Sequence, residues 1–200
     1  MNAIITADIV NSTQMDAREA KRFRAGLDAT FTGHKLEFFR GDSFQVLIKD
    51  PRFALRLVLR ARSLARSAGT NFDVRCSIGI GSTEGTVRSL ATASGEAFLL
   101  SGHAFDALED NRRLAIVSGS EASKTALRIL AAYADHLFRA LTAKQASVVY
   151  ELLSGKTQTE TAAQLKITQA TISSHAQSAA WGEIEYLLSE YDALCASAKS

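Results

Sequence analysis

The chain has 200 residues, of which 46% are hydrophobic and 22% are charged, and its formal net charge is +2 at pH 7. These values permit one large domain or two small ones with a hydrophobic core, and they argue against a chain that binds polyanions through its overall charge. No apolar stretch reaches the roughly 18 residues of a membrane span, and no secretory leader is evident. The two cysteines, Cys76 and Cys195, are far apart in the sequence, which fits a reducing compartment. We therefore expect a cytoplasmic protein without membrane contact.

Apolar periodicity predicts alternating strands and helices through the first 118 residues. The predicted strands cover residues 3–10, 35–49 as a hairpin, 72–80 and 113–118, and the predicted helices cover 15–31, 51–66 and 95–109. The order β-α-β-β-α-β-α-β is the ferredoxin-like split arrangement with an added helix and strand. The sequence therefore predicts an α+β fold for this part of the chain.

The sequence predicts helices throughout the C-terminal part of the chain. A connector helix is expected at 121–138, followed by three helical segments at 142–154, 157–165 and 169–191. Thr157 and Thr168 stand at N-cap positions, and the tight turn at residues 166–168 is typical of a helix-turn-helix. We expect an α+β domain at 1–120, a connector at 121–139 and a small all-α domain at 140–200.

Two acidic residues stand out in the predicted sheet. Asp8 closes the first apolar strand, and Asp42 follows Gly41 at the tip of the predicted hairpin. If the two strands are neighbours, the carboxylates meet at one end of the sheet, where they repel each other unless a cation lies between them. Mg²⁺ and Mn²⁺ favour such oxygen sites, usually completed by a phosphate. The pattern therefore indicates a metal–nucleotide site, and the alternative is a strand-end residue and a turn residue without ligand.

These stretches resemble a known family. Residues 7–13 (Ala-Asp-Ile-Val-Asn-Ser-Thr) and 40–44 (Arg-Gly-Asp-Ser-Phe) resemble two motifs of the class III nucleotidyl cyclase domain, and the hairpin is similar to that of the SatD-like bacterial proteins. The resemblance covers residues 3–118. It implies that Asp8 and Asp42 bind Mg²⁺ or Mn²⁺ with a nucleotide, and that domains pair head to tail through sheet and hairpin surfaces. It also implies nucleotide contacts by Asn11, Ser12, Thr13, Arg40 and Gly41.

The catalytic part of that motif set is missing. Aligning the helix after residue 95 with the corresponding cyclase helix places Leu99 and His103 where the family has Asn and Arg. Neither side chain supplies the guanidinium fork that grips phosphate oxygens. Losing such a transition-state partner costs roughly 10²–10³ in rate. We therefore name no catalytic residue and expect a ligand-binding or structural domain rather than an active cyclase.

The C-terminal segment resembles a second family. Residues 141–142, 152–155 and 159–172 resemble the helix-turn-helix of sigma-factor region 4 and of response-regulator output domains. The recognition helix would begin at Thr168, and Gln side chains suit adenine edges whereas lysines suit phosphates. The expected DNA contacts are Lys156, Lys166, Thr168, Gln169, Ser173, Ser174 and Gln177. Residues 168–186 contain no Lys or Arg, so one copy should bind weakly and a homodimer is expected.

Together these features predict a bacterial DNA-binding transcriptional regulator whose cyclase-like domain dimerises and senses a nucleotide. One alternative is an active class III cyclase with an appended regulatory module. A second alternative is a protein-interaction adaptor that uses both folds without nucleotide or DNA.

Overall fold

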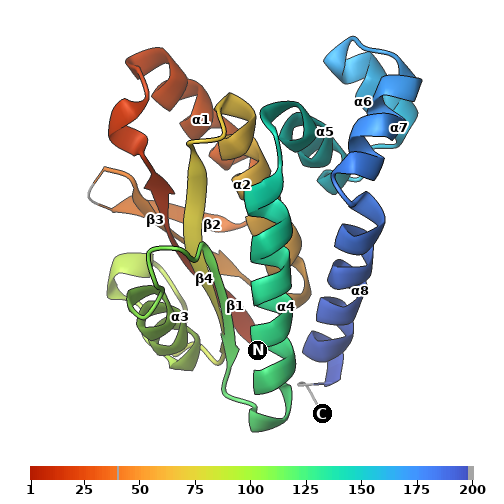
Figure 1. Cartoon of the computed structure of the whole chain (residues 1–200). Coiled ribbons are helices and arrows are strands. Elements are labelled where there is room, and N and C mark those ends of the chain that lie inside the picture. Colours follow the sequence, from red (N-terminus) through yellow and green to blue (C-terminus); the bar gives the residue numbers. More distant parts are fainter. Residues whose placement is uncertain (40, 198–200) are drawn as a thin grey trace.

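One mixed sheet of five strands, in the order β2-β3-β1-β4-β5, forms the centre of the molecule (Figure 1). This computed structural model describes residues 1–39 and 41–197. The strands are β1 (Asn2–Val10), β2 (Lys35–Phe39), β3 (Ser43–Ile48), β4 (Asp73–Gly81) and β5 (Leu114–Ser118). β1 lies antiparallel to both β3 and β4, and β5 is added parallel to β4. The structure thus confirms the predicted α+β fold with a ferredoxin-like core, one extra helix and one extra strand.

The two faces of the sheet differ in chemistry because side chains alternate along each strand. On β3, Phe44, Val46 and Ile48 are buried, and they pack into the core with α1 (Ala17–Thr30) and α2 (Ala54–Ala68). The opposite face carries polar residues, including Thr6 and Gln45, whose side chains are hydrogen-bonded. The helix α3 (Glu96–Asp106) covers one half of this polar face.

The close approach of α3 to the sheet depends on Gly79. An added Cβ at this position would contact the carbonyl oxygen of Ala97 and would lie 2.5 Å from the backbone nitrogen of Ser101. The absence of a side chain therefore lets α3 lie directly on β4, where Ser77 Oγ donates a 2.6 Å hydrogen bond to the Ser101 carbonyl. The strand β3 is instead contacted by a short 3-10 helix at Leu90–Thr92, which lines the same cavity as Gln45.

The described residues after β5 form five helices: α4 (Glu121–Ala140), α5 (Ala143–Leu153), α6 (Gln158–Leu165), α7 (Gln169–Ser178) and α8 (Trp181–Ser197). The predicted helix at 169–191 was wrong, because the chain breaks between α7 and α8 at Ala180, which has a φ of 55°. A left-handed alanine costs about 1 kcal/mol. The break lets α8 run beside α4 (Figure 1), where Ile184, Leu188 and Tyr191 are buried. This burial offsets the strain.

A buried ionic cluster links the sheet to the helices. Arg62 on α2 donates two hydrogen bonds to Asp73 on β4, at 2.9 and 2.8 Å, and forms a 2.9 Å ion pair with Asp135 on α4. Arg66, one turn further along α2, donates to the carbonyl oxygens of Arg139 and Leu141 at 2.8 and 2.7 Å. The cluster therefore fixes the end of α4, and with it the start of α5, to the sheet.

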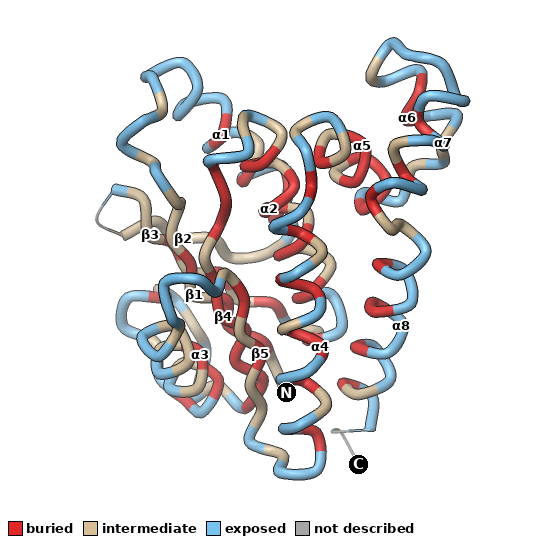
Figure 2. The backbone as a smooth tube through the Cα atoms, viewed as in Figure 1, coloured by how far each residue is buried: buried red, intermediate tan, exposed pale blue. Residues whose placement is uncertain are grey.

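The hydrophobic core continues across the end of α4. Leu141, Ala146 and Val149 belong to the same buried cluster as the sheet, whereas a smaller cluster holds α5, α6 and α7 together through Val148, Leu152, Ala162, Ile172 and Ala176. Figure 2 shows the buried residues running through the sheet and along the inner sides of α2, α4 and α8. The division of the chain at residues 120 and 140 stays a prediction. Among the described residues, no helix is long and apolar enough to span a membrane.

Candidate functional site

The structure brings Asp8 and Asp42 to the same end of the sheet. β1 and β3 are paired up to Ala7 and Phe44, so Asp8 lies within β1 just beyond this pairing, while Asp42 directly precedes β3. Burial raises the pKa of Asp8 above its usual value, Arg75 opposes this rise, and the negative charge of Asp42 adds to it.

Each carboxylate already has a partner. Arg75 lies opposite Asp8 on β4, and its Nη1 atom is 3.7 Å from Asp8 Oδ2. The same guanidinium donates to the Leu108 carbonyl, in the turn that follows α3, at 2.8 Å. Asp42 Oδ2 accepts a 2.6 Å hydrogen bond from Ser12 Oγ. Sequence reasoning missed Arg75, because only the strand register places it beside Asp8.

The other residues that were predicted to contact a nucleotide do not all face the two aspartates. Asn11 has a left-handed backbone, with a φ of 59°, and its amide donates to the Asn71 carbonyl at 2.7 Å. Ser12 and Thr13 form a short 3-10 turn (Ser12–Gln14) directly after β1. The Gly41 carbonyl accepts from Arg24 Nη2 at 3.0 Å. Arg40 lies outside the described residues. The structure therefore places Ser12 against Asp42 and turns the Asn11 side chain toward the loop before β4.

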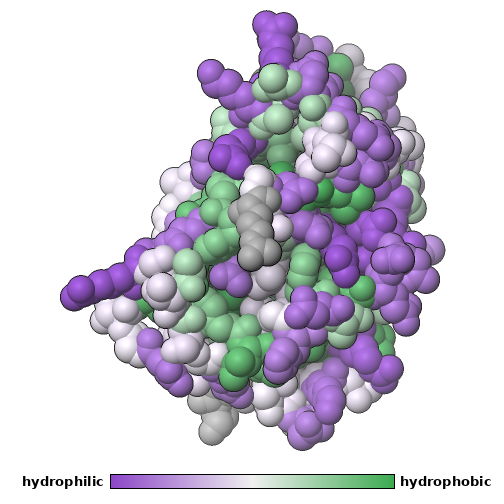
Figure 3. All heavy atoms as spheres, turned by 90° about the vertical axis from the view of Figure 1, so that its left-hand side faces the viewer, coloured by the Kyte–Doolittle hydropathy of each residue, from purple (hydrophilic) through white to green (hydrophobic). Residues whose placement is uncertain are grey.

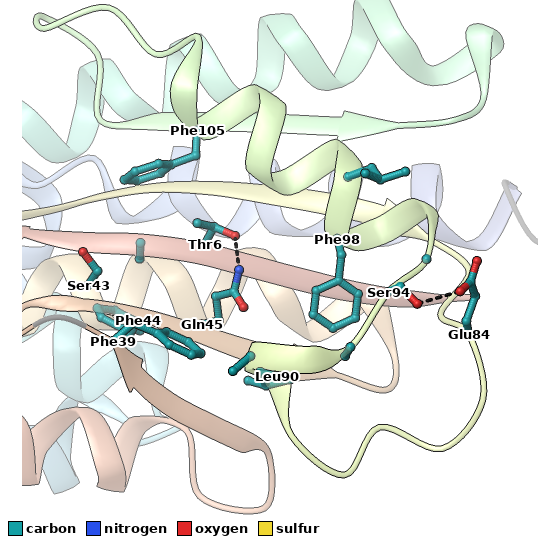
Figure 4. A pocket seen from close by; sticks show the side chains of 15 residues that line it. Thr6, Phe39, Ser43, Phe44, Gln45, Glu84, Leu90, Ser94, Phe98 and Phe105 are labelled. Atoms are coloured by element: carbon teal, nitrogen blue, oxygen red, sulfur yellow. Dashed lines mark hydrogen bonds between the residues drawn. The ribbon is translucent and has the colours of Figure 1, made fainter.

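A cavity of about 640 Å³ lies on the polar face of the sheet, between β3 and the segment that leads into α3. Figure 4 shows Thr6 and Gln45 at its floor, with Gln45 Nε2 donating to Thr6 Oγ1 at 3.2 Å. Thr6 Oγ1 in turn donates to Ser101 Oγ at 3.1 Å. The aromatic rings around this floor come from two elements, Phe39 from β2 and both Phe98 and Phe105 from α3. Figure 3, which shows the side with the β2–β3 hairpin, has apolar side chains gathered near the middle of that side.

The charge of the cavity lining limits which ligand groups the cavity can bind. Glu84 is the one charged side chain among the described residues that line it, and its carboxylate accepts a 2.6 Å hydrogen bond from Ser94. A triphosphate bound here would have no lining cation to offset its charge, whereas the aromatic rings and the Gln45 amide suit a planar group. Leu99 lines the cavity with 63% of its surface exposed, and His103 is exposed and outside the lining.

A metal ion at the acidic pair would need ligands from elsewhere. Within the described part of the chain, no group of three or more His, Cys, Asp or Glu residues is placed to hold a metal. Asp8 and Asp42 alone fit a Mg²⁺ or Mn²⁺ ion only if phosphate oxygens complete its coordination. The donor set is thus suited to a metal that arrives with a nucleotide.

The second candidate surface is the outer side of α6 and α7. Lys166 between these helices is left-handed, with a φ of 56°, as the tight turn predicted. The Thr168 hydroxyl accepts from the Thr171 backbone at 3.1 Å and caps α7. Thr157 caps α6 in the same way through Glu160, so both N-cap predictions are confirmed.

The α7 helix buries only Ile172 and Ala176. The remaining predicted contact residues on it are exposed, namely Gln169, Ser173, Ser174 and Gln177. Lys166 is exposed as well, whereas Lys156 forms a 2.6 Å ion pair with Glu151. The structure therefore gathers the polar residues of α7 on one open side and leaves Lys156 partly neutralised.

Comparisons with known proteins give little further guidance. No protein-family model matches the chain, and no curated protein matches it. A solved bacterial light-regulated adenylyl cyclase is similar at 17% identity and a TM-score of 0.40, over 58% of this chain and 42% of that one. This level of similarity does not indicate a function for the chain.

Proposed function

We propose that this protein is a DNA-binding regulator in which α5, α6 and α7 act as a helix-turn-helix. The observation that supports this function is the open side of α7, where the exposed side chains are short hydroxyls and two amides. Short side chains allow a helix to approach base edges in the major groove, and an amide can pair with adenine in two places. The Lys166 turn and the Thr168 cap set the start of this helix.

Phosphate contacts in this proposal come from few groups. Lys166 is exposed directly before the first turn of α7, and the backbone N–H groups of that turn favour anions. Lys156 contributes less because Glu151 neutralises it. Affinity for DNA rises with the number of phosphates neutralised, so one copy binds weakly and two copies are needed for useful affinity.

The test is binding to selected and scrambled duplexes over a salt series. Lys166→Ala should weaken binding to both duplexes and lower the salt slope by about one. Gln169→Ala should leave binding to the scrambled duplex unchanged and should weaken binding to the selected duplex by about 1–3 kcal/mol, through the loss of recognition at one base position. The matched control is Lys49→Ala, which removes an exposed lysine directly after β3 and should change binding to neither duplex. If both test variants bind like the wild type, the helix-turn-helix does not read DNA and the adaptor function is preferred.

We further propose that the acidic pair receives a nucleotide with Mg²⁺ or Mn²⁺ as an effector. The position of Asp8 and Asp42 at the same end of the sheet supports this site, because a divalent ion would offset the charge of two neighbouring carboxylates. Asp8 and Asp42 would hold such an ion together with phosphate oxygens of the nucleotide, and the rings around the nearby cavity would hold the base. Mn²⁺ with ATP or GTP should raise the melting temperature of the wild type but not of Asp42→Asn.

The active-cyclase alternative is tested in the same samples. We expect no cyclic nucleotide, because Leu99 lines the cavity and offers no group for the developing phosphate charge. Sustained cyclic nucleotide formation that is lost in Asp42→Ala would reverse this assignment.

A further inference from the structure

A row of polar side chains crosses the sheet on the face that carries the cavity. Gln45 on β3 stands directly opposite Glu37 on β2 and Thr6 on β1. Thr6 in turn stands opposite Ser77 on β4. Residues that are directly opposite in a sheet share one face, so all four side chains point to the side that α3 and the 3-10 helix at Leu90–Thr92 contact. Polar groups that are covered in this way need hydrogen-bond partners.

The two outer members of this row are committed to the protein itself. Glu37 accepts a 3.0 Å hydrogen bond from Ser89 Oγ and a 2.9 Å bond from the Leu90 backbone N–H, and so it holds the 3-10 helix on the sheet. Ser77 is completely buried, and its Oγ donates to the Ser101 carbonyl. Neither side chain is therefore free to bind a ligand in the cavity.

A chain of hydrogen bonds sets the orientation of the Gln45 amide. The Phe98 carbonyl can only accept, so Ser101 Oγ donates to it, at 3.1 Å. Ser101 Oγ then accepts from Thr6 Oγ1 at 3.1 Å, and Thr6 Oγ1 accepts from Gln45 Nε2 at 3.2 Å. Because each hydroxyl has a single proton to donate, the amide nitrogen of Gln45, and not its oxygen, must face Thr6.

This orientation leaves Gln45 with one acceptor and one donor for the cavity. Among the described residues, neither Gln45 Oε1 nor the second proton of Nε2 has a hydrogen-bond partner. Gln45 lines the cavity together with the rings of Phe39 and Phe98 (Figure 4). A planar ring between such side chains would pair with both amide groups if it carried a donor beside an acceptor, as adenine does with glutamine.

We propose that Gln45 is the specificity-determining residue of this cavity, and that it selects a ligand whose ring carries an N–H group beside an acceptor atom. The edges of adenine and guanine have this pattern, whereas unsubstituted purine offers acceptors only. The inference rests on the proposed nucleotide effector and adds which edge of the base is recognised. Thr6 is a positioning residue, because it acts through the Gln45 amide.

The test is calorimetric titration of the wild type with ATP, GTP and purine riboside triphosphate, each with Mn²⁺. The three probes share the triphosphate and the metal and differ only in the base. At least one of ATP and GTP should bind roughly tenfold more tightly than purine riboside triphosphate, because a ring without a donor leaves Gln45 Oε1 unpaired. Equal affinity for all three would overturn this inference and leave the effector site standing. Binding of none of them would overturn both.

Two variants assign the preference to the amide. Gln45→Leu should bind the three nucleotides with similar affinity, and Thr6→Val should lose part of the preference because the amide is no longer oriented. The matched control is Gln164→Leu, which replaces an exposed glutamine on α6 and should keep the preference of the wild type. If Gln45→Leu keeps the full preference, another residue reads the base and the proposal is wrong. The comparison of the three probes on the wild type decides the matter even if a variant does not fold.

Discussion

Replacing Arg62 by methionine should destabilise the whole molecule, because Arg62 is the centre of the buried ionic cluster. Its side chain is completely buried and lies between the carboxylates of Asp73 and Asp135, which are 5% and 0% exposed. Methionine has a similar length but no charge. The substitution therefore leaves two buried carboxylates with weaker partners, namely Arg66 at 3.7 Å from Asp73 and Arg139 at 3.3 Å from Asp135.

The size of the effect follows from the burial of the cluster. Removing one partner of a buried ion pair typically costs about 3–5 kcal/mol, because the remaining charge cannot be solvated. A domain of this size has a free energy of unfolding of about 5–15 kcal/mol, so the loss is a large fraction of it. At about 2–4 °C per kcal/mol for chains of this length, the melting temperature should fall by about 6–20 °C.

The measurement is urea unfolding followed by circular dichroism, with the melting temperature as a second value. Arg52→Met is the matched control: Arg52 also pairs with an aspartate, Asp50, but its side chain is 48% exposed. Exposed pairs contribute little, so this variant should unfold almost as the wild type does. If Arg62→Met loses no more stability than Arg52→Met, the cluster does not hold α4 and α5 to the sheet, and our account of this packing is wrong.

Three further predictions concern the site and the helices around it. Asp8→Asn should have a higher free energy of unfolding than the wild type at pH 7. Folding raises the pKa of Asp8 above its ordinary value of 3.8, so the wild type loses stability as the pH rises above 3.8 and this carboxyl group ionises. Thermal melts should show that the difference between the two proteins disappears below pH 3.8. Lys166→Gly should raise the free energy of unfolding by about 1 kcal/mol, because glycine relieves the left-handed strain, and it should weaken DNA binding. A variant that is more stable and also binds DNA more tightly would argue against a phosphate contact by Lys166. Gly79→Ala should lower the free energy of unfolding by about 1–3 kcal/mol, because the added methyl group meets the backbone of α3. If urea unfolding shows that the variant and the wild type are equally stable, α3 is not packed this closely on β4.

The sequence by itself determined the local elements and their order. Alternation and helical periodicity predicted the strands and helices of the α+β part, because these patterns depend on neighbours only a few residues away. The caps at Thr157 and Thr168 were readable for the same reason, since each hydroxyl binds the backbone three residues later. The sequence predicted that Asp8 and Asp42 meet if their strands are neighbours, and the pairing of β1 with β3 fulfils that condition.

Only the tertiary structure decided what surrounds these elements. Arg75 neutralises Asp8 because the register of β1 and β4 sets them opposite each other, and no local pattern encodes that register. The break at Ala180 also escaped the sequence, since alanine is the strongest helix former and gives no local sign of a left-handed residue. The chain bends there because α8 gains more by burying Tyr191, whose hydroxyl donates to the Pro51 carbonyl at 2.9 Å, than a straight helix would gain in solvent. Long-range packing thus overrides local preference where a large apolar face can be buried.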